Sequence, residues 1–542
     1  MDKLRLAFAL RYLPLTLCII ATPFFFSVAM AAPIFGGLFK LLALVFAALA
    51  LLGVRDLLQK RHAILRSHPI AGHLRFLLEQ VRPEIRQYFF EDEKSGAPFS
   101  RDKRALVYQR AKNELDKRPF GTELDVYAEG FEFMRHSIAP TTPAEEPHRI
   151  KIGPECAQPY SASILNISAM SFGALSANAI RALNAGAKRG GFAHDTGEGG
   201  VSAYHRENGG DLIWEVGSGY FGCRGGDGRF SSDLFAQIAV DPQIRMVELK
   251  LSQGAKPGHG GVLPAAKLTP EIAAIRGVPL GVDCVSPARH SAFSTPIELV
   301  RFVDEMRRLS GGKPAGFKLC IGQPVEFLAI CKAMLETGLT PDFIVIDGKE
   351  GGTGAAPLEF MDHLGMPMRE ALNFAHNALV GAGLRDRIRI GAAGKIVSAF
   401  DIARALALGA DWCNAARGFM FALGCIQSQS CHNDRCPTGV ATQDPDRMSA
   451  LYVPDKAERV YRFHRSTLMT LAELTAAAGL EHPADFTVSH FARRVSPREI
   501  AGFEHLYPQL AAGELIAGSD DPRFRDAWKR ARADTFAASR TG

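Results

Sequence analysis

The stretch Asp342-Phe-Ile-Val-Ile-Asp347, followed directly by Gly348-Lys-Glu-Gly-Gly-Thr-Gly354, decides the fold. Its first half is a short, apolar and β-branched run, which predicts a buried strand. Its second half is a glycine-rich loop that carries charged side chains. The sequence therefore predicts a strand whose carboxyl end opens into a loop suited to holding a ligand.

The same unit recurs along the chain. Helix-forming stretches separate most of the strands, and eight strands alternating with helices over about 250 residues predict an α/β, TIM-type (β/α)8 barrel. A doubly wound parallel sheet is the rival, which the count of eight disfavours. The expected strands are 164–168, 191–195, 246–251, 280–284, 315–320, 342–347, 388–393 and 411–415, and the expected helices include 175–189, 296–309, 323–337 and 397–409.

Glycine-rich loops follow the last three of these strands, at Gly348, Gly391 and Ala415. Glycine lets backbone N–H groups approach a phosphate closely, and barrels often bind phosphate with the loops after strands seven and eight. Three such loops favour a phosphorylated cofactor over ordinary tight turns.

Polar side chains at or near other strand ends add chemistry. Gln253 could hydrogen-bond the edge of a planar heterocycle and Lys256 could hold a carboxylate, while Glu198 lies on a glycine loop above the same face. Lys318 falls inside a strand, where it could reach the pyrimidine end of a flavin, and a buried lysine is costly unless it is paired or functional. Each alone is also explained as a solvated loop residue, but their grouping favours a site.

Three cysteines, Cys425, Cys431 and Cys436, have five and four residues between them and precede Pro437. Thiolates at short, fixed spacings are typical of iron–sulfur sites, and three ligands would suit a three-iron cluster. Zinc with His432 as a fourth ligand is one alternative, although structural zinc favours paired Cys-x(2–4)-Cys units. Inert buried cysteines are the other alternative.

The remaining composition narrows the class of protein. The other seven of the ten cysteines stand alone, mostly in apolar runs, which is typical of a reducing compartment. The net charge of +6 is spread along the chain without a basic tract, so we expect no nucleic-acid partner.

Two apolar stretches at the N-terminus, 12–30 and 34–53, are each about long enough to cross a bilayer and are separated by Ala31-Ala32-Pro33. A cleaved secretory signal is the alternative, but a second apolar stretch directly behind the first argues against it. The positive-inside rule predicts a hairpin in the lipid bilayer of the inner (cytoplasmic) membrane, multi-pass, with both ends and the catalytic domain in the cytoplasm. The basic residues outside the hairpin are Lys3, Arg5, Arg11, Arg55, Lys60, Arg61 and Arg66.

These patterns divide the chain into four parts. We expect a transmembrane hairpin (1–55), a helical membrane-proximal segment (56–150), the barrel with the cysteine motif (151–455) and a helical C-terminal tail (456–542).

Five motifs, in chain order, resemble the FMN-binding synthase domain of glutamate synthase. The resemblance covers residues 125–460, and the hairpin together with Asp125-Val-Tyr-Ala-Glu-Gly130 resembles the standalone, membrane-anchored branch of that family. The motifs are Ala169-Met-Ser-Phe-Gly-Ala-Leu-Ser176, Gly197-Glu-Gly-Gly200, Gln253-Gly-Ala-Lys-Pro-Gly258, Gly351-Gly-Thr-Gly-Ala-Ala-Pro357 and Cys425-x5-Cys431-His-x3-Cys436-Pro-Thr-Gly-Val-Ala-Thr-Gln443.

The resemblance implies FMN at the barrel mouth and a [3Fe–4S] cluster close to it. Electrons would enter through the cluster and leave as hydride to C2 of 2-iminoglutarate, which forms L-glutamate. Glu198 and Lys256 would lie on the 2-oxoglutarate side, and Cys425, Cys431 and Cys436 would ligate iron. The residues implied around FMN are Ala169, Met170, Ser171, Gln253, Lys318, Gly351, Gly352, Thr353, Gly394, Ala416 and Arg417.

Departures from the family pattern also bear on function. The chain begins Met1-Asp2-Lys3, without a glutaminase domain, so we expect ammonia, an amine donor or another subunit to supply nitrogen. Gly391-Ala-Ala-Gly394 replaces Val-Asp-Gly-Gly, and Val201 replaces a second acid, so phosphate contacts and substrate could differ. We expect no nucleotide-binding βαβ unit, and hence an electron donor such as ferredoxin, a reductase subunit or a quinone-linked protein.

Two other functions remain open. One is a flavin-dependent dehydrogenase of another amine or hydroxy acid that passes electrons to a membrane acceptor, which the hairpin favours. The other is a non-enzymatic electron-transfer or scaffold subunit, which the presence of Lys256 and Glu198 disfavours.

Overall fold

The computed structural model describes residues 7–31 and 35–537, which divide into two compact units, Met1–Arg101 and Asp102–Gly542. Lys3, Arg5 and the predicted turn at Ala32-Pro33 lie outside the described residues.

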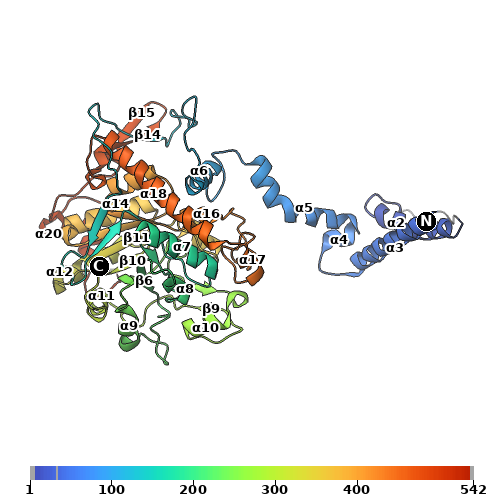
Figure 1. Ribbon diagram of the computed structural model, residues 1–542, viewed down its shortest axis with the longest axis horizontal. Helices are drawn as coiled ribbons and strands as arrows, with labels where there is room; N and C mark the ends of the chain where they lie inside the picture. The colour runs from blue at the N-terminus through green and yellow to red at the C-terminus, as the bar shows by residue number, and fades with distance from the viewer. Residues whose placement is uncertain (1–6, 32–34, 538–542) are drawn as a thin grey trace. The chain divides into compact units, whose positions relative to one another are not determined.

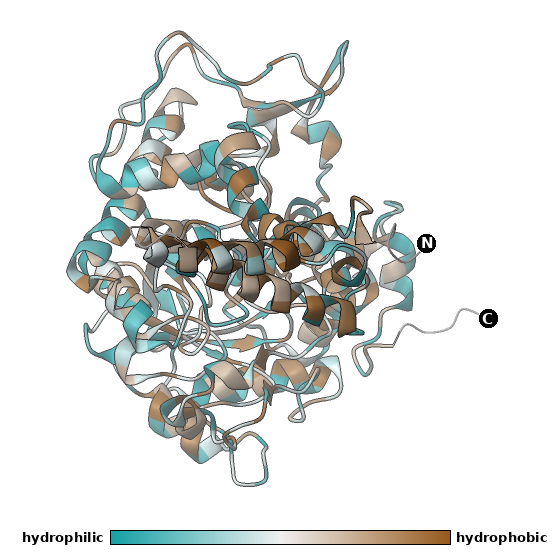
Figure 2. Cartoon of the chain, turned by 90° about the vertical axis from the view of Figure 1, so that its right-hand side faces the viewer, coloured by the Kyte–Doolittle hydropathy of each residue, from teal (hydrophilic) through white to brown (hydrophobic). Residues whose placement is uncertain are grey.

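Two long apolar helices, α2 (Leu13–Ala31) and α3 (Gly36–Leu58), lead the first unit. Both are long and apolar enough to cross a membrane, and Figure 2 draws them mainly in the brown of apolar residues. They pack side by side, with the ring centroid of Phe25 5.4 Å from that of Phe46. The predicted pair of helices is therefore confirmed, while its place in a bilayer stays a prediction.

The first unit continues with α4 (Ala63–Ser67), α5 (Ala71–Ile85) and a π-helical turn, η1 (Arg86–Phe90). Asp56 near the end of α3 is 2% exposed and accepts hydrogen bonds from the backbone N–H of Ile70 at 3.0 Å and from Nε2 of His73 at 2.9 Å. These bonds fix the start of α5 against the end of α3.

The second unit is built around a closed barrel of eight parallel strands (Figure 1). The strands follow chain order around the barrel, and the last pairs with the first, so the predicted TIM-type α/β fold is confirmed. They are β4 (Leu165–Ile167), β5 (His194–Asp195), β6 (Leu212–Val216), β7 (Ile244–Lys250), β10 (Ala315–Leu319), β11 (Phe343–Asp347), β12 (Arg389–Ala393) and β13 (Trp412–Ala415).

One of the eight predicted strands is wrong. Residues 280–284 lie outside the barrel, and β9 (Cys284–Val285) pairs with β8 (Val262–Leu263) in a small antiparallel sheet. The missed strand is β6, Leu-Ile-Trp-Glu-Val, whose apolar run is interrupted by Glu215. A charged residue inside a buried strand hides it from a search for apolar runs.

The loop after β6, Gly217-Ser-Gly-Tyr-Phe-Gly222, matches the letters of the Gly-x-Gly-x-x-Gly nucleotide motif. It runs through turns, and the next helix begins only at Ser232, so it lacks the strand–turn–helix context that the motif requires.

Helices wrap the barrel (Figure 1), and the four predicted helices are all observed. The side chains of Ser176, Thr295 and Ser398 accept hydrogen bonds from backbone N–H groups at the starts of α7, α11 and α15, as N-cap residues do. The helices are α7 (Ala177–Gly190), α8 (Ala203–Arg206), α9 (Ser232–Ala239), α10 (Pro270–Arg276), α11 (Pro296–Leu309), α12 (Pro324–Thr337), α13 (Leu358–His363), α14 (Met368–Gly381), α15 (Ala399–Ala407) and α16 (Arg417–Leu423).

The chain outside the barrel holds further helices and two small sheets. Glu132 on β1 ties them to the barrel wall, because its buried carboxylate lies 2.6 Å from Arg404 and 2.7 Å from Arg493. The tail is helical as far as Ala477 and then adds two strands to β1. These elements are α6 (Arg101–Lys112), β1 (Glu132–Met134), β2 (Arg149–Ile152), β3 (Tyr160–Ser163), α17 (Pro445–Ser449), α18 (Val453–Ala477), β14 (Phe491–Ser496), β15 (Glu499–Gly502), α19 (Phe503–Leu506), α20 (Glu514–Ala517) and α21 (Arg525–Arg530).

Candidate active site at the carboxyl end of the barrel

The loops after β4 and β5 pack backbone against backbone. Gly197 has a φ of +65°, and a β-carbon there would lie 2.6 Å from the backbone nitrogen of Ser171. A residue with a side chain would push the two loops apart. The glycine therefore brings the predicted cofactor residues Ala169, Met170 and Ser171 beside the loop that carries Glu198.

Glu198 meets a lysine at the end of β7. Its Oε1 lies 3.0 Å from Nζ of Lys250, which also donates a 2.6 Å hydrogen bond to Oε1 of Gln253. Burial raises the pKa of Glu198, but Lys250, Arg276 and Lys256 outweigh it, so the net pKa is below its ordinary value. Glu198 is therefore held as a carboxylate, and Gln253 is oriented by a contact that the sequence did not predict.

Lys256 lies in the same cluster. It is 2% exposed, and its ammonium donates to the backbone carbonyl of Ala355 at 3.2 Å. Burial lowers its pKa, an effect that nearby Glu198 partly offsets. The structure thus brings together the two predicted catalytic residues, which are near enough to shift each other's pKa.

The loops after β7 and β11 also meet through glycine. The backbone N–H of Gly254 donates to Oδ2 of Asp347 at 2.9 Å, and a β-carbon on Gly254 would lie 1.7 Å from the carbonyl oxygen of Gly348. No other residue fits at 254 in this backbone. Gly351 lies against the same loop, since a β-carbon built on it would lie 3.4 Å from the backbone nitrogen of Ala255.

The loops after β12 and β13 complete the rim. Arg417 donates through Nη2 to the carbonyl of Thr353 at 3.2 Å. The same nitrogen would lie 3.3 Å from a β-carbon built on Gly352. Ala416 and Arg417 are therefore joined to the β11 loop. Gly394 packs against Met368 at the start of α14. The backbone N–H of Met368 donates to Glu350 at 2.9 Å, so Gly394 borders the other side of the β11 loop.

The cysteine segment closes over two of these loops. A β-carbon on Gly354 would lie 3.7 Å from Cβ of Cys431. Gln443 donates to the carbonyl of Leu175 at 2.8 Å, and the buried ammonium of Lys267 donates to Ala174 at 2.8 Å and Ala441 at 3.3 Å. The segment is therefore fixed to the loop after β4 and lies beside the loop after β11.

The three thiols have different surroundings. Burial raises the pKa of Cys425 to about 11, and Cys431 and Cys436 contribute to the rise. Burial also acts on Cys436, but backbone N–H groups of Ala441 and its neighbours bring that pKa below its ordinary value. N–H groups directed at a sulfur stabilise a thiolate, which is the form that binds metal.

Among the described residues, the three sulfurs are not within 4.8 Å of one another. Two sulfurs on one zinc ion at about 2.3 Å lie at most about 4.6 Å apart. The three sulfurs are therefore not arranged as ligands of one zinc ion, and the assignment of these thiols to a metal centre stays a prediction.

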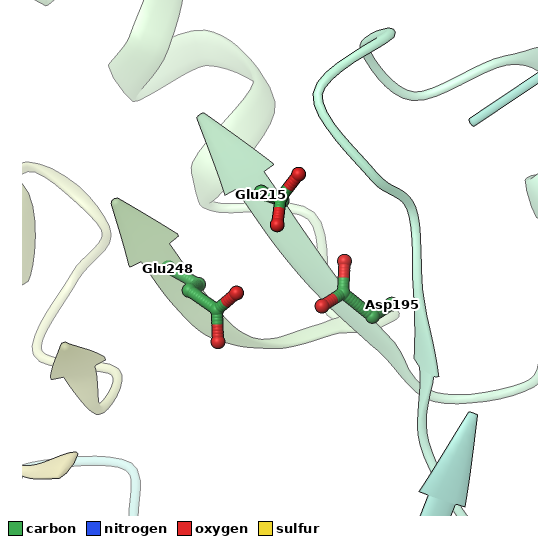
Figure 3. Close-up of side chains that lie close together, drawn as sticks. All are labelled: Asp195, Glu215 and Glu248. Carbon is green, nitrogen blue, oxygen red and sulfur yellow. The ribbon is translucent and has the colours of Figure 1, made fainter. Parts of the chain in front are cut away.

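A cluster of buried acids that the sequence did not predict lies inside the barrel. Asp195, Glu215 and Glu248 lie on the neighbouring strands β5, β6 and β7 and point toward one another (Figure 3), with carboxylate oxygens within 4.8 Å. Lys318 from β10 pairs with Glu215 and lies 3.3 Å from Glu248. Lys318 was predicted as a flavin contact, and the structure joins its ammonium to these acids.

Burial disfavours a charge on these acids. Burial, followed by Glu215, raises the pKa of Asp195 to about 7, and burial raises that of Glu248 well above its ordinary value. Among the described residues, Oδ2 of Asp195 and both oxygens of Glu248 have no hydrogen-bond partner. At Lys318 burial lowers the pKa, but the neighbouring acids outweigh this effect, so its pKa lies above the ordinary value. Asp195, Glu248 and Lys318 inside predicted strands were the signal, since a buried lysine implies a buried acid, whereas Glu215 lies on the strand that was not predicted.

The donor set at the rim fits a planar, phosphorylated cofactor such as FMN. Glycine loops after β11, β12 and β13 present backbone groups, and the Gln253 side chain, which Lys250 orients, supplies a hydrogen-bonding amide beside them. The thiol set fits an iron–sulfur cluster at the edge of the same rim.

Comparison with known proteins gives consistent matches. Residues 131–481 match the model of a family described as a conserved region in glutamate synthase. The glutamate synthase large subunit-like protein YerD of Bacillus subtilis is 36% identical over 514 residues, which cover 87% of this chain and 97% of that protein. An archaeal-type glutamate synthase (NADPH) of Thermotoga neapolitana is 35% identical over 316 residues, which cover 58% of this chain and 59% of that protein.

Among solved structures, a flavocytochrome b2 double mutant with pyruvate bound is 11% identical over 74% of this chain and 85% of that chain, with a TM-score of 0.41. That likeness is too low to bear on function.

Proposed function

The chain belongs to the glutamate synthase family, and from this premise we propose that it is an oxidoreductase that reductively aminates 2-oxoglutarate, through 2-iminoglutarate, to L-glutamate. We propose FMN and a [3Fe–4S] cluster as its cofactors. Nitrogen comes from ammonia or an amine donor, and electrons come from a partner protein.

One observation carries the proposal. The glycine loop expected to hold FMN and the cysteine segment expected to hold the cluster lie side by side at Gly354 and Cys431, where a β-carbon on the glycine would lie 3.7 Å from Cβ of the cysteine. Electron transfer between two cofactors needs them close together, and this proximity supports such a pair. Cys425, Cys431 and Cys436 would ligate the cluster, and the eleven residues from Ala169 to Arg417 named for FMN would surround the flavin.

The chain's own residues would bind and orient the substrate. Lys256, a buried cation with one hydrogen bond to Ala355, would hold a carboxylate of 2-oxoglutarate. Glu198, kept ionised by Lys250, would hold the ammonium or imine nitrogen by charge and orient it. The glycine-packed loops exclude bulk water from this cluster. FMN, when bound, would supply the hydride.

The anchor and the barrel would have separate tasks. We propose that the hairpin (1–55) and the membrane-proximal segment (56–150) hold the enzyme at the inner membrane, with the barrel (151–455) and the tail (456–542) in the cytoplasm. The two apolar helices support this placement.

The test is a cofactor analysis followed by an assay on the full-length protein in detergent. We expect bound FMN, about three irons per chain, and glutamate formation from 2-oxoglutarate and ammonium with a viologen donor. Purified protein without flavin, or with flavin but no glutamate formation, would overturn the proposal.

The hairpin also favours the second candidate, a dehydrogenase that passes electrons from another amine or hydroxy acid to a membrane acceptor. The same preparation distinguishes them. Amine- or hydroxy-acid-dependent quinone reduction without reductive amination would select the second candidate.

A further inference from the structure

Helix α5 and the turn η1 carry an apolar stripe that faces outwards. Its members recur at i, i+3, i+4, i+7 and i+11, which places them on one side of a helix. All are exposed, from 37% at Val81 and Ile85 to 60% at Leu74, and Phe89 in the turn is 81% exposed. The stripe consists of Leu74, Leu77, Leu78, Val81, Ile85, Tyr88 and Phe89. An aligned, exposed stripe of this size marks an interaction surface.

The start of α5 is tied to the end of α3. A 23-residue helix such as α3 is about 35 Å long, close to the thickness of a bilayer's hydrocarbon core, so its end would lie at the membrane surface. Asp56, near that end, bonds the N–H of Ile70 and the ring of His73. The first turn of α5 would therefore lie at headgroup level.

The charges flanking the stripe suit an anionic lipid surface. Arg75, Arg82 and Arg86 repeat at i, i+7 and i+11 along one edge of it and are exposed, and they outnumber the two exposed acids of the helix, Glu79 and Glu84. Long arginine side chains beside an apolar face can reach lipid phosphates while their stems cover apolar surface. The linker before α5 adds the exposed Lys60 and Arg61.

We propose that Ala71–Phe90 lies in the plane of the membrane surface, with its apolar stripe inserted among the lipids of the leaflet from which the hairpin emerges. This goes beyond the proposed reaction and rests on the proposed anchoring. The helix would fix the distance between the bilayer and the chain segment that leads to the barrel. Two transmembrane helices alone would leave that segment free to rotate. A basic amphipathic helix of low mean hydropathy is the kind that binds at an interface.

The test uses nitroxide-labelled, full-length protein in nanodiscs of phosphatidylcholine and phosphatidylglycerol. Leu77→Cys and Val81→Cys report on the stripe, and Glu79→Cys reports on the opposite side of the same helix. Wild-type protein labelled in parallel gives the signal of the native cysteines, and flavin content shows that each variant keeps its barrel intact.

We expect labels at 77 and 81 to collide with lipid-soluble oxygen several-fold more often than with an aqueous nickel chelate, and the label at 79 to show the reverse. Equal access of the chelate to 77 and 79 would overturn the inference. So would protection of 77 from both reagents, which would mean that protein, whether the barrel or a second copy, covers the stripe.

A label at Leu44→Cys, on the exposed side of α3, reports on the anchoring by itself. A lipid-like label at 44 with a water-like label at 77 would contradict the surface helix and leave the anchored enzyme standing. A water-like label at 44 would contradict the anchoring instead.

Discussion

A β-carbon built on Gly354 would lie 3.7 Å from Cβ of Cys431, so the glycine loop after β11 and the cysteine segment lie side by side, about one methyl group apart. Residues 77 positions apart in the chain thereby join the two predicted cofactor sites at one rim of the barrel. The predictions below concern that rim and the buried charges beneath it.

Cys436→Ser should abolish iron binding and leave flavin content unchanged. A serine hydroxyl is a poor iron ligand, and Cys436 is the thiol whose pKa backbone N–H groups lower. Iron and FMN per chain are the quantities to measure. Cys156→Ser is the matched control, because the Cys156 thiol donates to Asp342 at the far end of β11, away from the cysteine segment. This variant should retain its iron. Full iron retention in Cys436→Ser would refute the ligand assignment.

Lys256→Met should raise the KM for 2-oxoglutarate about 10- to 100-fold with FMN content unchanged. A charge-assisted hydrogen bond contributes about 1.5–3 kcal/mol, which corresponds to that range. Steady-state kinetics at saturating ammonium give the value, and Lys188→Ala, an exposed helix lysine, is the control. An unchanged KM would remove Lys256 from the substrate site.

Glu215→Gln and Glu248→Gln should differ in stability although the strands pair these residues directly. Glu215→Gln takes the closest counter-charge from buried Lys318, which costs about 3–5 kcal/mol. Glutamine mimics the protonated acid that burial favours at Glu248, so that variant should lose less than about 1 kcal/mol. Urea unfolding followed by the fluorescence of buried Trp214 and Trp412 measures both. Equal losses would contradict a protonated Glu248.

Asp195→Asn should change how stability depends on pH. The pKa of Asp195 is raised from 3.8 to about 7, so its contribution is fully present below 3.8 and is lost as the pH rises through about 7. Asparagine does not titrate. The thermal midpoint of the variant, relative to wild type, should therefore rise between about pH 4 and pH 7. A constant difference across that range would show that Asp195 titrates normally.

The barrel was predictable because most of its strands are apolar runs between glycine loops, as at Phe343–Asp347. The exception, β6, carries Glu215 into the barrel interior. A charged residue within a strand interrupts the apolar run by which the strand would be recognised, and only the structure shows that Lys318 pairs with this charge. Residues 280–284 have the composition of a strand but lie outside the barrel, which shows that local propensity yields to tertiary packing.

Candidate site residues could be predicted from the sequence where they belong to a motif. Contacts between residues far apart in the chain could not. Glu198 and Lys256 were identified on sequence, but Lys250, which holds Glu198 as a carboxylate, became evident only from the 3.0 Å contact. The acids around Lys318 come from three separate strands, so their meeting depends on barrel closure and register. The spacing of the apolar stripe on α5 can be read from the sequence. Its position relative to the membrane cannot, because that depends on the hydrogen bond from the N–H of Ile70 to Asp56.

A single-turnover experiment tests the central claim most directly. Full-length enzyme is reduced anaerobically, freed of excess reductant, and mixed with 2-oxoglutarate and ¹⁵N-ammonium while flavin absorbance is followed. The account predicts that flavin reoxidises in step with the formation of about one ¹⁵N-glutamate per flavin, because one hydride reduces one imine. Flavin that stays reduced with both substrates present, or reoxidises without labelled glutamate, would contradict it.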